Sequence, residues 1–91
     1  MSNWLYKITK EAEDDLDKLD RQVRDRVLEK LKWMTDNFGN IIPLPLGGKW
    51  LGFFKLRVGD WRIIYEIDLT EKMVIIHQVD RRDKVYNRRR K

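Results

Sequence analysis

The sequence predicts an α+β fold with the element order β-α-α-β-β-β, in which an antiparallel sheet carries an N-terminal helical hairpin packed on one face. Three observations support this fold class. Apolar and polar residues alternate at the start of the chain and again through its second half, which is the period of a strand. Between these parts, apolar residues recur at helical spacing. A segment rich in proline and glycine then separates the helical part from the second strand region.

The first strand is expected over residues 3–8, where Trp4, Tyr6 and Ile8 lie on one face. Thr9 follows this strand and offers a hydroxyl group that can cap the N-terminus of a helix. The strand is therefore expected to end where the first helix begins.

Two helices are expected next, over residues 10–19 and then from Asp20, which is placed to cap the second helix. Residues 37–39 should stop the second helix, and the two prolines and the glycine pair within 41–48 make the following segment a loop. The apolar positions at helical spacing are Ala12, Leu16, Leu19, Val23, Val27, Leu31 and Met34.

Three strands are expected in the second half, over residues 52–58, 61–67 and 72–79. The first two are separated by Gly59 and Asp60, and glycine at the first central position suits a type II′ hairpin turn. With this turn, two arginines lie directly opposite each other across the strands, at positions 57 and 62.

The hairpin separates its side chains into two faces. The apolar face, expected to join the core, contains Phe54, Leu56, Val58, Trp61, Ile63 and Tyr65. The opposite face contains Lys55, Arg57 and Arg62, and such a cluster of cations favours an anion such as a phosphodiester. The alternative is an ordinary exposed face on which Glu66 and neighbouring acids balance these charges.

Composition limits the classes of function. The net charge is +5, with acidic residues concentrated near the start and basic residues in the second half, as expected for a surface that faces phosphates. No run approaches the ~20 apolar residues of a transmembrane helix, and the first residues do not resemble a signal peptide, so the expected location is the cytoplasm. With 0 cysteines and 1 histidine, we expect no disulfide, no metal and no cofactor.

The length of 91 residues predicts a single domain over 1–91 with a short basic tail at 87–91. The acidic run at 13–17 is expected to form a solvated face near a helix N-terminus. Trp33 and Trp50 are expected to be packing residues. His77 is expected to be an ordinary strand residue in register with Met73, Ile75 and Val79.

The hairpin KLRVGDWRIIYEI at 55–67, followed by VDRRDKVY at 79–86, resembles the RelE/ParE superfamily of toxins from type II toxin–antitoxin systems. The resemblance spans nearly the whole chain, although the motif separates the subfamilies poorly. It implies the RelE-like form of the fold and a metal-independent endoribonuclease that cleaves messenger RNA at the ribosome. It also implies a cognate antitoxin as partner. Two alternatives remain open, which are a ParE-like inhibitor of DNA gyrase and a catalytically inactive relative that binds RNA.

The resemblance implies four catalytic residues, namely Lys55, Arg62, Arg82 and Tyr86. In the implied reaction a ribose 2′-hydroxyl attacks the neighbouring phosphate. This chemistry needs a base, an acid and fixed cations around the phosphate. Tyr86 is the candidate base, Arg82 the acid or phosphate ligand, and the other two stabilise charge. A tyrosine has an ordinary pKa near ~10 and acts as a base only beside cations, so Tyr86 alternatively anchors the tail on the sheet.

The chain departs from the family pattern at two positions. Phe53 stands where relatives have a second hairpin lysine, so either Lys49 compensates for that charge or Phe53 stacks on an RNA base. Arg81 stands where some relatives have a histidine. The residues expected to bind RNA are Lys49, Phe53, Arg57 and Arg81.

Overall fold

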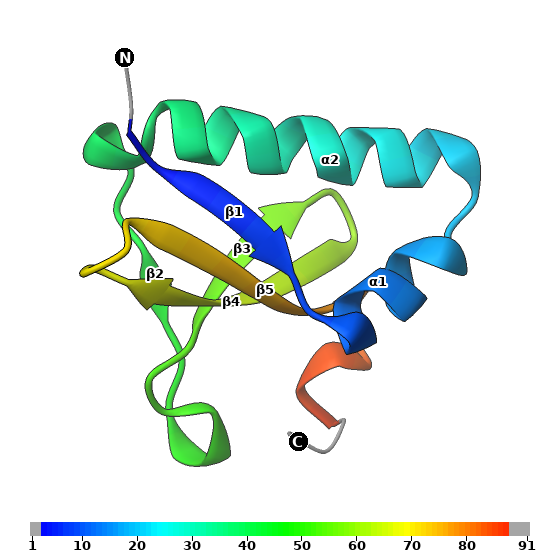
Figure 1. The fold of residues 1–91 in the computed structure, drawn as a ribbon. Coiled ribbons are helices and arrows are strands. Elements are labelled where there is room, and N and C mark those ends of the chain that lie inside the picture. Colours follow the sequence, from blue (N-terminus) through cyan, green and yellow to red (C-terminus); the bar gives the residue numbers. More distant parts are fainter. Residues whose placement is uncertain (1–2, 88–91) are drawn as a thin grey trace.

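The computed structural model describes residues 3–87, in which two helices lie on one face of a five-stranded sheet (Figure 1). The α+β class predicted from the sequence is confirmed. The elements are β1 (Leu5–Ile8), α1 (Lys10–Asp17), α2 (Arg21–Asp36), β2 (Leu44–Pro45), β3 (Phe54–Val58), β4 (Trp61–Asp68) and β5 (Met73–Arg81). Two short 3-10 turns, η1 (Phe38–Asn40) and η2 (Gly48–Trp50), lie between α2 and β2 and between β2 and β3, and a third, η3 (Val85–Asn87), follows β5.

The sheet differs from the expected one at both edges, by a parallel pairing at one edge and an additional strand at the other. Its strand order is β1-β5-β4-β3-β2, and β1 pairs with β5 in parallel, while the other neighbours pair antiparallel. The short strand β2 forms within the segment expected to be a loop. Alternation along a strand shows which side chains share a face, but it carries no information about which strand lies alongside, so the parallel pairing was not predictable from it.

Both predicted helix caps are present. The Thr9 hydroxyl accepts a hydrogen bond from the backbone N–H of Ala12 at 3.2 Å, and the Asp20 carboxylate accepts one from the N–H of Val23 at 3.0 Å. These bonds satisfy N–H groups that the first turn of a helix leaves without partners. They fix the places where the chain turns from β1 into α1 and from α1 into α2.

The predicted hairpin between β3 and β4 is confirmed. Val58 lies opposite Trp61, and Arg57 lies opposite Arg62. Gly59 has a φ angle of 59°, and Asp60 is not among the residues with positive φ, a combination that distinguishes a type II′ turn from a type I′ turn.

The main core lies between the helices and the sheet. The predicted apolar face of the hairpin belongs to this core, either as buried residues or packed against it. The buried members of the core are Ala12, Leu16, Val27, Leu31, Met34, Val58, Ile63, Tyr65, Val74, Ile76 and Val79. The seven apolar positions predicted at helical spacing in α1 and α2 all contribute to the same core.

A bulge in β5 corrects the expected register of His77. Ile64 lies opposite Gln78 and Tyr65 lies opposite Ile76, so His77 is an extra residue without an opposite partner. One extra residue shifts the alternation of the strand by one position. Val79 therefore lies in the helix-side core, and the prediction that it shares a face with His77 is wrong.

The acidic run is only partly solvated. Asp15, on α1, has a relative exposure of 9%, and its carboxylate accepts a hydrogen bond from the backbone N–H of Val79 at 3.0 Å. The neighbouring Asp14 and Asp17 are exposed, as expected. The expectation failed at Asp15 because the fold brings this position of α1 against β5, directly after the bulge.

No helix within residues 3–87 has the length and apolar character needed to cross a membrane.

Candidate functional site

The candidate site lies on the sheet surface that faces away from the helices, which we call the open face. By the alternation of β3 and β4, this surface carries Lys55, Arg57, Arg62, Ile64 and Glu66. The first three of these are the cations predicted to share a face. The structure places them on adjacent strands, with the two arginines as direct cross-strand partners.

A second, smaller apolar cluster covers part of the open face. Its buried members are Trp50, Ile64 and Val85, and Leu46, Phe53 and Tyr86 pack against them. The indole N–H of Trp50 donates a hydrogen bond to the backbone carbonyl of Tyr86 at 3.4 Å. The segment around η2 and the C-terminal turn η3 are therefore held together on this surface. The expected packing role of Trp50 is confirmed, since its relative exposure is 4%.

Trp33 does not fill the packing role expected for it. Its relative exposure is 45%, and the Lys30 amine lies 4.1 Å from the ring centroid. The residue sits between Leu31 and Met34, which form the buried stripe of α2, and its own position on the helix turns it away from the core. Trp33 lines a groove of about 380 Å³ at the sheet edge, together with Ile42, Leu44, Lys55 and Arg57 among others.

Arg62 bends back onto the hairpin turn. Its guanidinium donates hydrogen bonds to the backbone carbonyls of Gly59 at 2.8 Å and Trp61 at 2.9 Å. The backbone N–H of Arg82 donates to the carbonyl of Asp60 at 2.9 Å, in the same turn. The structure thus brings the segments carrying the predicted residues Arg62 and Arg82 to one place, and Arg82 is exposed there.

Arg81 lies apart from the open face. It is the cross-strand partner of Trp61, whose ring packs against the helix-side core. Its guanidinium is 5.9 Å from the centroid of that ring and 3.8 Å from the Asp83 carboxylate. Because the bulge shifts the alternation of β5 before this residue, the structure does not group Arg81 with the hairpin cations.

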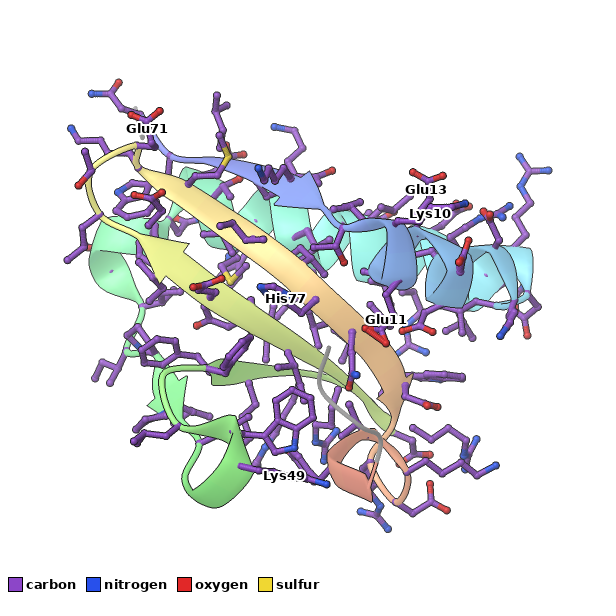
Figure 2. The ribbon with its side chains drawn as sticks, turned by 60° about the horizontal axis from the view of Figure 1, so that its bottom comes forward. Lys10, Glu11, Glu13, Lys49, Glu71 and His77 are labelled. Atoms are coloured by element: carbon purple, nitrogen blue, oxygen red, sulfur yellow. The ribbon has the colours of Figure 1, made fainter. Side chains whose placement is uncertain are left out.

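Two other residues expected to bind RNA, Lys49 and Phe53, lie in and shortly after η2, in the loop that leads into β3. Lys49 is exposed on the loop at η2, on the same side of the molecule as the C-terminal turn (Figure 2). Phe53 is half-buried. The centroid of its ring lies 5.7 Å from that of the Trp50 ring and 4.9 Å from that of the His77 ring. Of the expected basic tail, residues 88–91 lie outside the described part of the chain.

Tyr86 is enclosed by the second cluster. Its hydroxyl oxygen is buried and has no hydrogen-bond partner in the described residues 3–87. In this conformation the phenol ring anchors η3 on the sheet. This is the structural role that the sequence left open as the alternative to a catalytic base. A role as base requires that this hydroxyl be uncovered.

A pair not recognised in the sequence also occupies the open face. The Nε2 atom of His77 lies 2.9 Å from a carboxylate oxygen of Glu66, on the neighbouring strand. Their side chains are 28% and 46% exposed. The pairing could not be predicted from the sequence, because the two residues are eleven positions apart. Only the β4–β5 register with its bulge brings them together. No three His, Cys, Asp or Glu side chains within 3–87 are grouped as metal ligands would be.

The α+β fold matches solved structures of RelE toxins. The chain is similar to the crystal structure of the toxin–antitoxin complex RelBE2 from Mycobacterium tuberculosis, with a TM-score of 0.78 and 29% identity over 87% of this chain and 98% of that chain. It shares its fold with the archaeal RelE–RelB complex from Pyrococcus horikoshii, with a TM-score of 0.70 and 24% identity over 90% and 98% of the two chains. A mutant of the E. coli toxin RelE in the free state gives a TM-score of 0.75 and 18% identity over 94% and 90%.

The family model described as the ParE toxin of the type II toxin–antitoxin system parDE matches residues 6–86, and the chain therefore belongs to this family. The predicted membership of the RelE/ParE superfamily is confirmed, and the protein is a toxin of a toxin–antitoxin system. Among curated protein sequences, none matches the chain.

Proposed function

We propose that this toxin is a metal-independent endoribonuclease that cleaves messenger RNA at the ribosome. The observation that carries this proposal is the placement of Lys55, Arg57 and Arg62 across adjacent strands of the open face. A surface on which cations outnumber acids favours the phosphates of a nucleic acid. The proposed substrate is a message under translation, so the proposed place of action is the cytoplasm.

In the proposed reaction, Lys55, Arg62 and Arg82 hold the scissile phosphate and stabilise the charge that develops on it. Fixed cations are effective here because they need no rearrangement when the transition state forms. For Arg62 this requires that at least part of its guanidinium leaves the turn carbonyls, or that its remaining N–H groups face the phosphate, since a guanidinium has five donors. Arg57 and Lys49 contact the neighbouring phosphates, and Phe53 stacks on a base.

The resemblance assigns the role of base to Tyr86. If Tyr86 acts in this way, the C-terminal turn must move so that the enclosed hydroxyl reaches the ribose. Such a motion separates the Tyr86 carbonyl from the indole of Trp50. Protection of the Trp50 indole N–H from exchange would then fall when RNA binds.

The direct test of the proposed function is primer extension on cellular messages after the protein is induced. Cuts inside translated codons that appear with the wild-type protein and are absent with Lys55→Ala support the proposal. An identical experiment with purified messenger RNA, with and without ribosomes, separates ribosome-dependent cleavage from cleavage of free RNA. Uncut messages in the presence of growth arrest would contradict the proposal.

Inhibition of DNA gyrase is the second candidate function, and the match to the ParE toxin family over residues 6–86 favours it. The enclosed Tyr86 hydroxyl is also consistent with a binding toxin that performs no RNA chemistry. A supercoiling assay with purified gyrase distinguishes the two functions. A relative that binds RNA without cleaving it would leave both messages and gyrase unaffected.

We further propose that a cognate antitoxin neutralises this toxin through an extended acidic or amphipathic segment. The similar structures include toxin–antitoxin complexes from M. tuberculosis, P. horikoshii and E. coli. Acidic side chains on the antitoxin would meet the basic open face. Co-expression with the product of the neighbouring reading frame should restore growth and yield a complex that co-purifies, whereas absence of binding by either neighbour would contradict the proposal.

A further inference from the structure

The pair formed by His77 and Glu66 has the geometry of a base and the group that orients it. The Nε2 atom of the imidazole lies 2.9 Å from the carboxylate oxygen. A carboxylate can only accept a hydrogen bond, so Nε2 carries the proton and donates it. The lone pair then resides on Nδ1, which is the arrangement by which a carboxylate prepares a histidine to accept a proton.

The bulge in β5 gives this histidine its position. His77 has no opposite residue on β4, because Ile64 and Tyr65 pair with the residues on either side of it. A bulge turns a side chain out of the regular alternation, and bulges are frequent beside active sites. The Phe53 ring contacts the imidazole edge-on, with ring centroids 4.9 Å apart, and limits the orientations that the imidazole can adopt.

The pair shares the open face with the cations of the proposed site. Lys55 lies opposite Ile64, and Ile64 lies opposite Gln78, which is adjacent to His77. Two strand spacings, about 10 Å in total, thus separate the backbone of Lys55 from that of His77. Long side chains reaching inward from both positions can contact the same nucleotide.

The strands that flank His77 are β1 and β4. Their charged residues on the open face are Lys7, opposite Ile75, and Arg62, Glu66 and Asp68. On the strand of His77 itself, Asp80 lies opposite Arg62, and Glu11 of α1 accepts a hydrogen bond from the neighbouring Gln78 at 3.5 Å. Lys55 and Arg57 lie one strand further away, on β3.

We propose that His77 is the general base of the cleavage reaction and that Glu66 is the residue that positions it. This inference rests on the proposed ribonuclease function. A histidine is suited to the role because it exchanges protons near neutral pH. The Tyr86 hydroxyl, in contrast, is buried and has no hydrogen-bond partner among residues 3–87, whereas the imidazole is partly exposed on the same face.

In the proposed step, Nδ1 of His77 removes the proton of the ribose 2′-hydroxyl. The 2′-oxygen forms a bond to phosphorus, and the bond between phosphorus and the 5′-oxygen breaks. The 5′-oxygen takes a proton from water, and the imidazolium returns its proton to the solvent. The products are a 2′,3′-cyclic phosphate and a free 5′-hydroxyl, and no metal, oxidant or reductant is needed.

The test uses the full chain and a defined messenger RNA, both free and on programmed ribosomes. Single-turnover cleavage rates are measured from pH 5 to pH 9 for wild type, His77→Gln and Glu66→Gln. The matched control is Glu71→Gln, because Glu71 is an exposed carboxylate in the turn between β4 and β5, away from His77 (Figure 2). Thermal unfolding of each variant reports whether it is folded.

We expect His77→Gln to cleave at least ~100-fold more slowly than wild type, the range for loss of a general base. The decline in rate toward acidic pH, present in wild type, should be absent in this variant. Glu66→Gln should also cleave more slowly than wild type, because the imidazole loses the carboxylate that holds its proton on Nε2, and the acidic limb of its rate profile should differ from that of wild type. Glu71→Gln should match wild type in rate and profile.

His77→Gln cleaving within about threefold of wild type, with the same pH profile, would overturn the inference while leaving the ribonuclease function intact. Absence of cleavage by the wild-type protein itself would overturn the proposed function and this inference with it. If His77→Gln does not fold, the Glu66→Gln profile decides. An acidic limb identical to that of wild type overturns the inference, because a purely structural hydrogen bond would change stability without changing the profile.

Discussion

At the scale of single residues, Arg62 has both a structural role in the hairpin turn and a place in the proposed site. Two hydrogen bonds tie its guanidinium to the backbone carbonyls of the β3–β4 turn. The side chain also belongs to the cationic group of the open face, opposite Arg57. The two hydrogen bonds fix the position of the Arg62 guanidinium before a phosphate binds. The exposed side chain of Arg57 becomes ordered only when the phosphate binds.

Arg62→Ala should therefore remain folded and lose most of its toxicity. Loss of two hydrogen bonds from a partly exposed group should lower the free energy of unfolding by about 1–2 kcal/mol. Arg57→Ala, at an exposed position, is the control and should stay within about 0.5 kcal/mol of wild type. Urea denaturation measures both. Unfolding of Arg62→Ala would show that the turn bonds, and not the charge, explain the presence of this arginine.

The hydroxyl of Tyr86 is another single-atom feature with a measurable consequence. A buried polar atom without a partner destabilises the folded state by about 1–3 kcal/mol. Tyr86→Phe removes this oxygen and keeps the ring that packs on the second cluster.

We expect Tyr86→Phe to be as stable as wild type or more stable, by up to about 1 kcal/mol. With His77 as base, its cleavage rate should stay within about threefold of wild type, measured by the single-turnover assay. A loss of ~100-fold or more in a folded Tyr86→Phe variant would instead assign the base to Tyr86, as the family resemblance implies.

At the scale of elements, the bulge in β5 and helix α1 form one structural unit. The bulge shifts the strand so that the side chain of Val79 enters the core. The backbone N–H of Val79 donates a hydrogen bond to the buried Asp15 carboxylate and not to a carbonyl of a neighbouring strand. The strand that carries His77 is therefore fixed in register by a side chain of α1. A buried backbone N–H without this acceptor would be left unsatisfied.

Asp15→Ala should accordingly lower the free energy of unfolding by about 1–3 kcal/mol. Asp17→Ala is the control, because Asp17 is exposed in the last turn of the same helix, where removal of a negative charge is neutral or slightly stabilising. Urea denaturation and hydrogen exchange at Val79 measure the effect. Equal stability of the two variants would mean that water replaces the carboxylate at no cost.

At the scale of the whole molecule, the small core contains a tyrosine whose titration is linked to folding. Burial raises the pKa of Tyr65 from 10.0 to about 12. The unfolded chain would release this proton from pH ~10 upward, while the folded protein retains it up to about pH 12. The contribution to stability is thus fully present below pH ~10 and is lost as the pH rises toward 12.

We expect the free energy of unfolding to decrease by about 2–3 kcal/mol between pH 9 and pH 12 through this group. The free energy of unfolding of Tyr65→Phe should not show this decrease, although its value at pH 9 will differ from that of wild type. Tyr6→Phe, which removes a phenol from a half-buried strand residue of β1, controls for general alkaline effects. Parallel pH curves for wild type and Tyr65→Phe would contradict the linkage.

The sequence by itself determined the local features of this protein. Helical spacing placed the buried stripes of α1 and α2, side chains at Thr9 and Asp20 capped the helices, and Gly59 set the hairpin turn. These features depend on residues close in the chain, whose geometry follows from backbone sterics and periodicity. The hairpin register then placed the cations of positions 55, 57 and 62 on one face.

Only the tertiary structure decided the relations between distant segments. The parallel pairing of β1 with β5, the burial of Asp15, the enclosure of Tyr86 and the pairing of Glu66 with His77 all depend on which elements pack together. The physical reason is that packing energy is shared by the whole core, whereas alternation and spacing record only the preferences of each segment. A single extra residue in β5 reversed the facing of the strand beyond it, and that residue is visible only when its partner strand is in place.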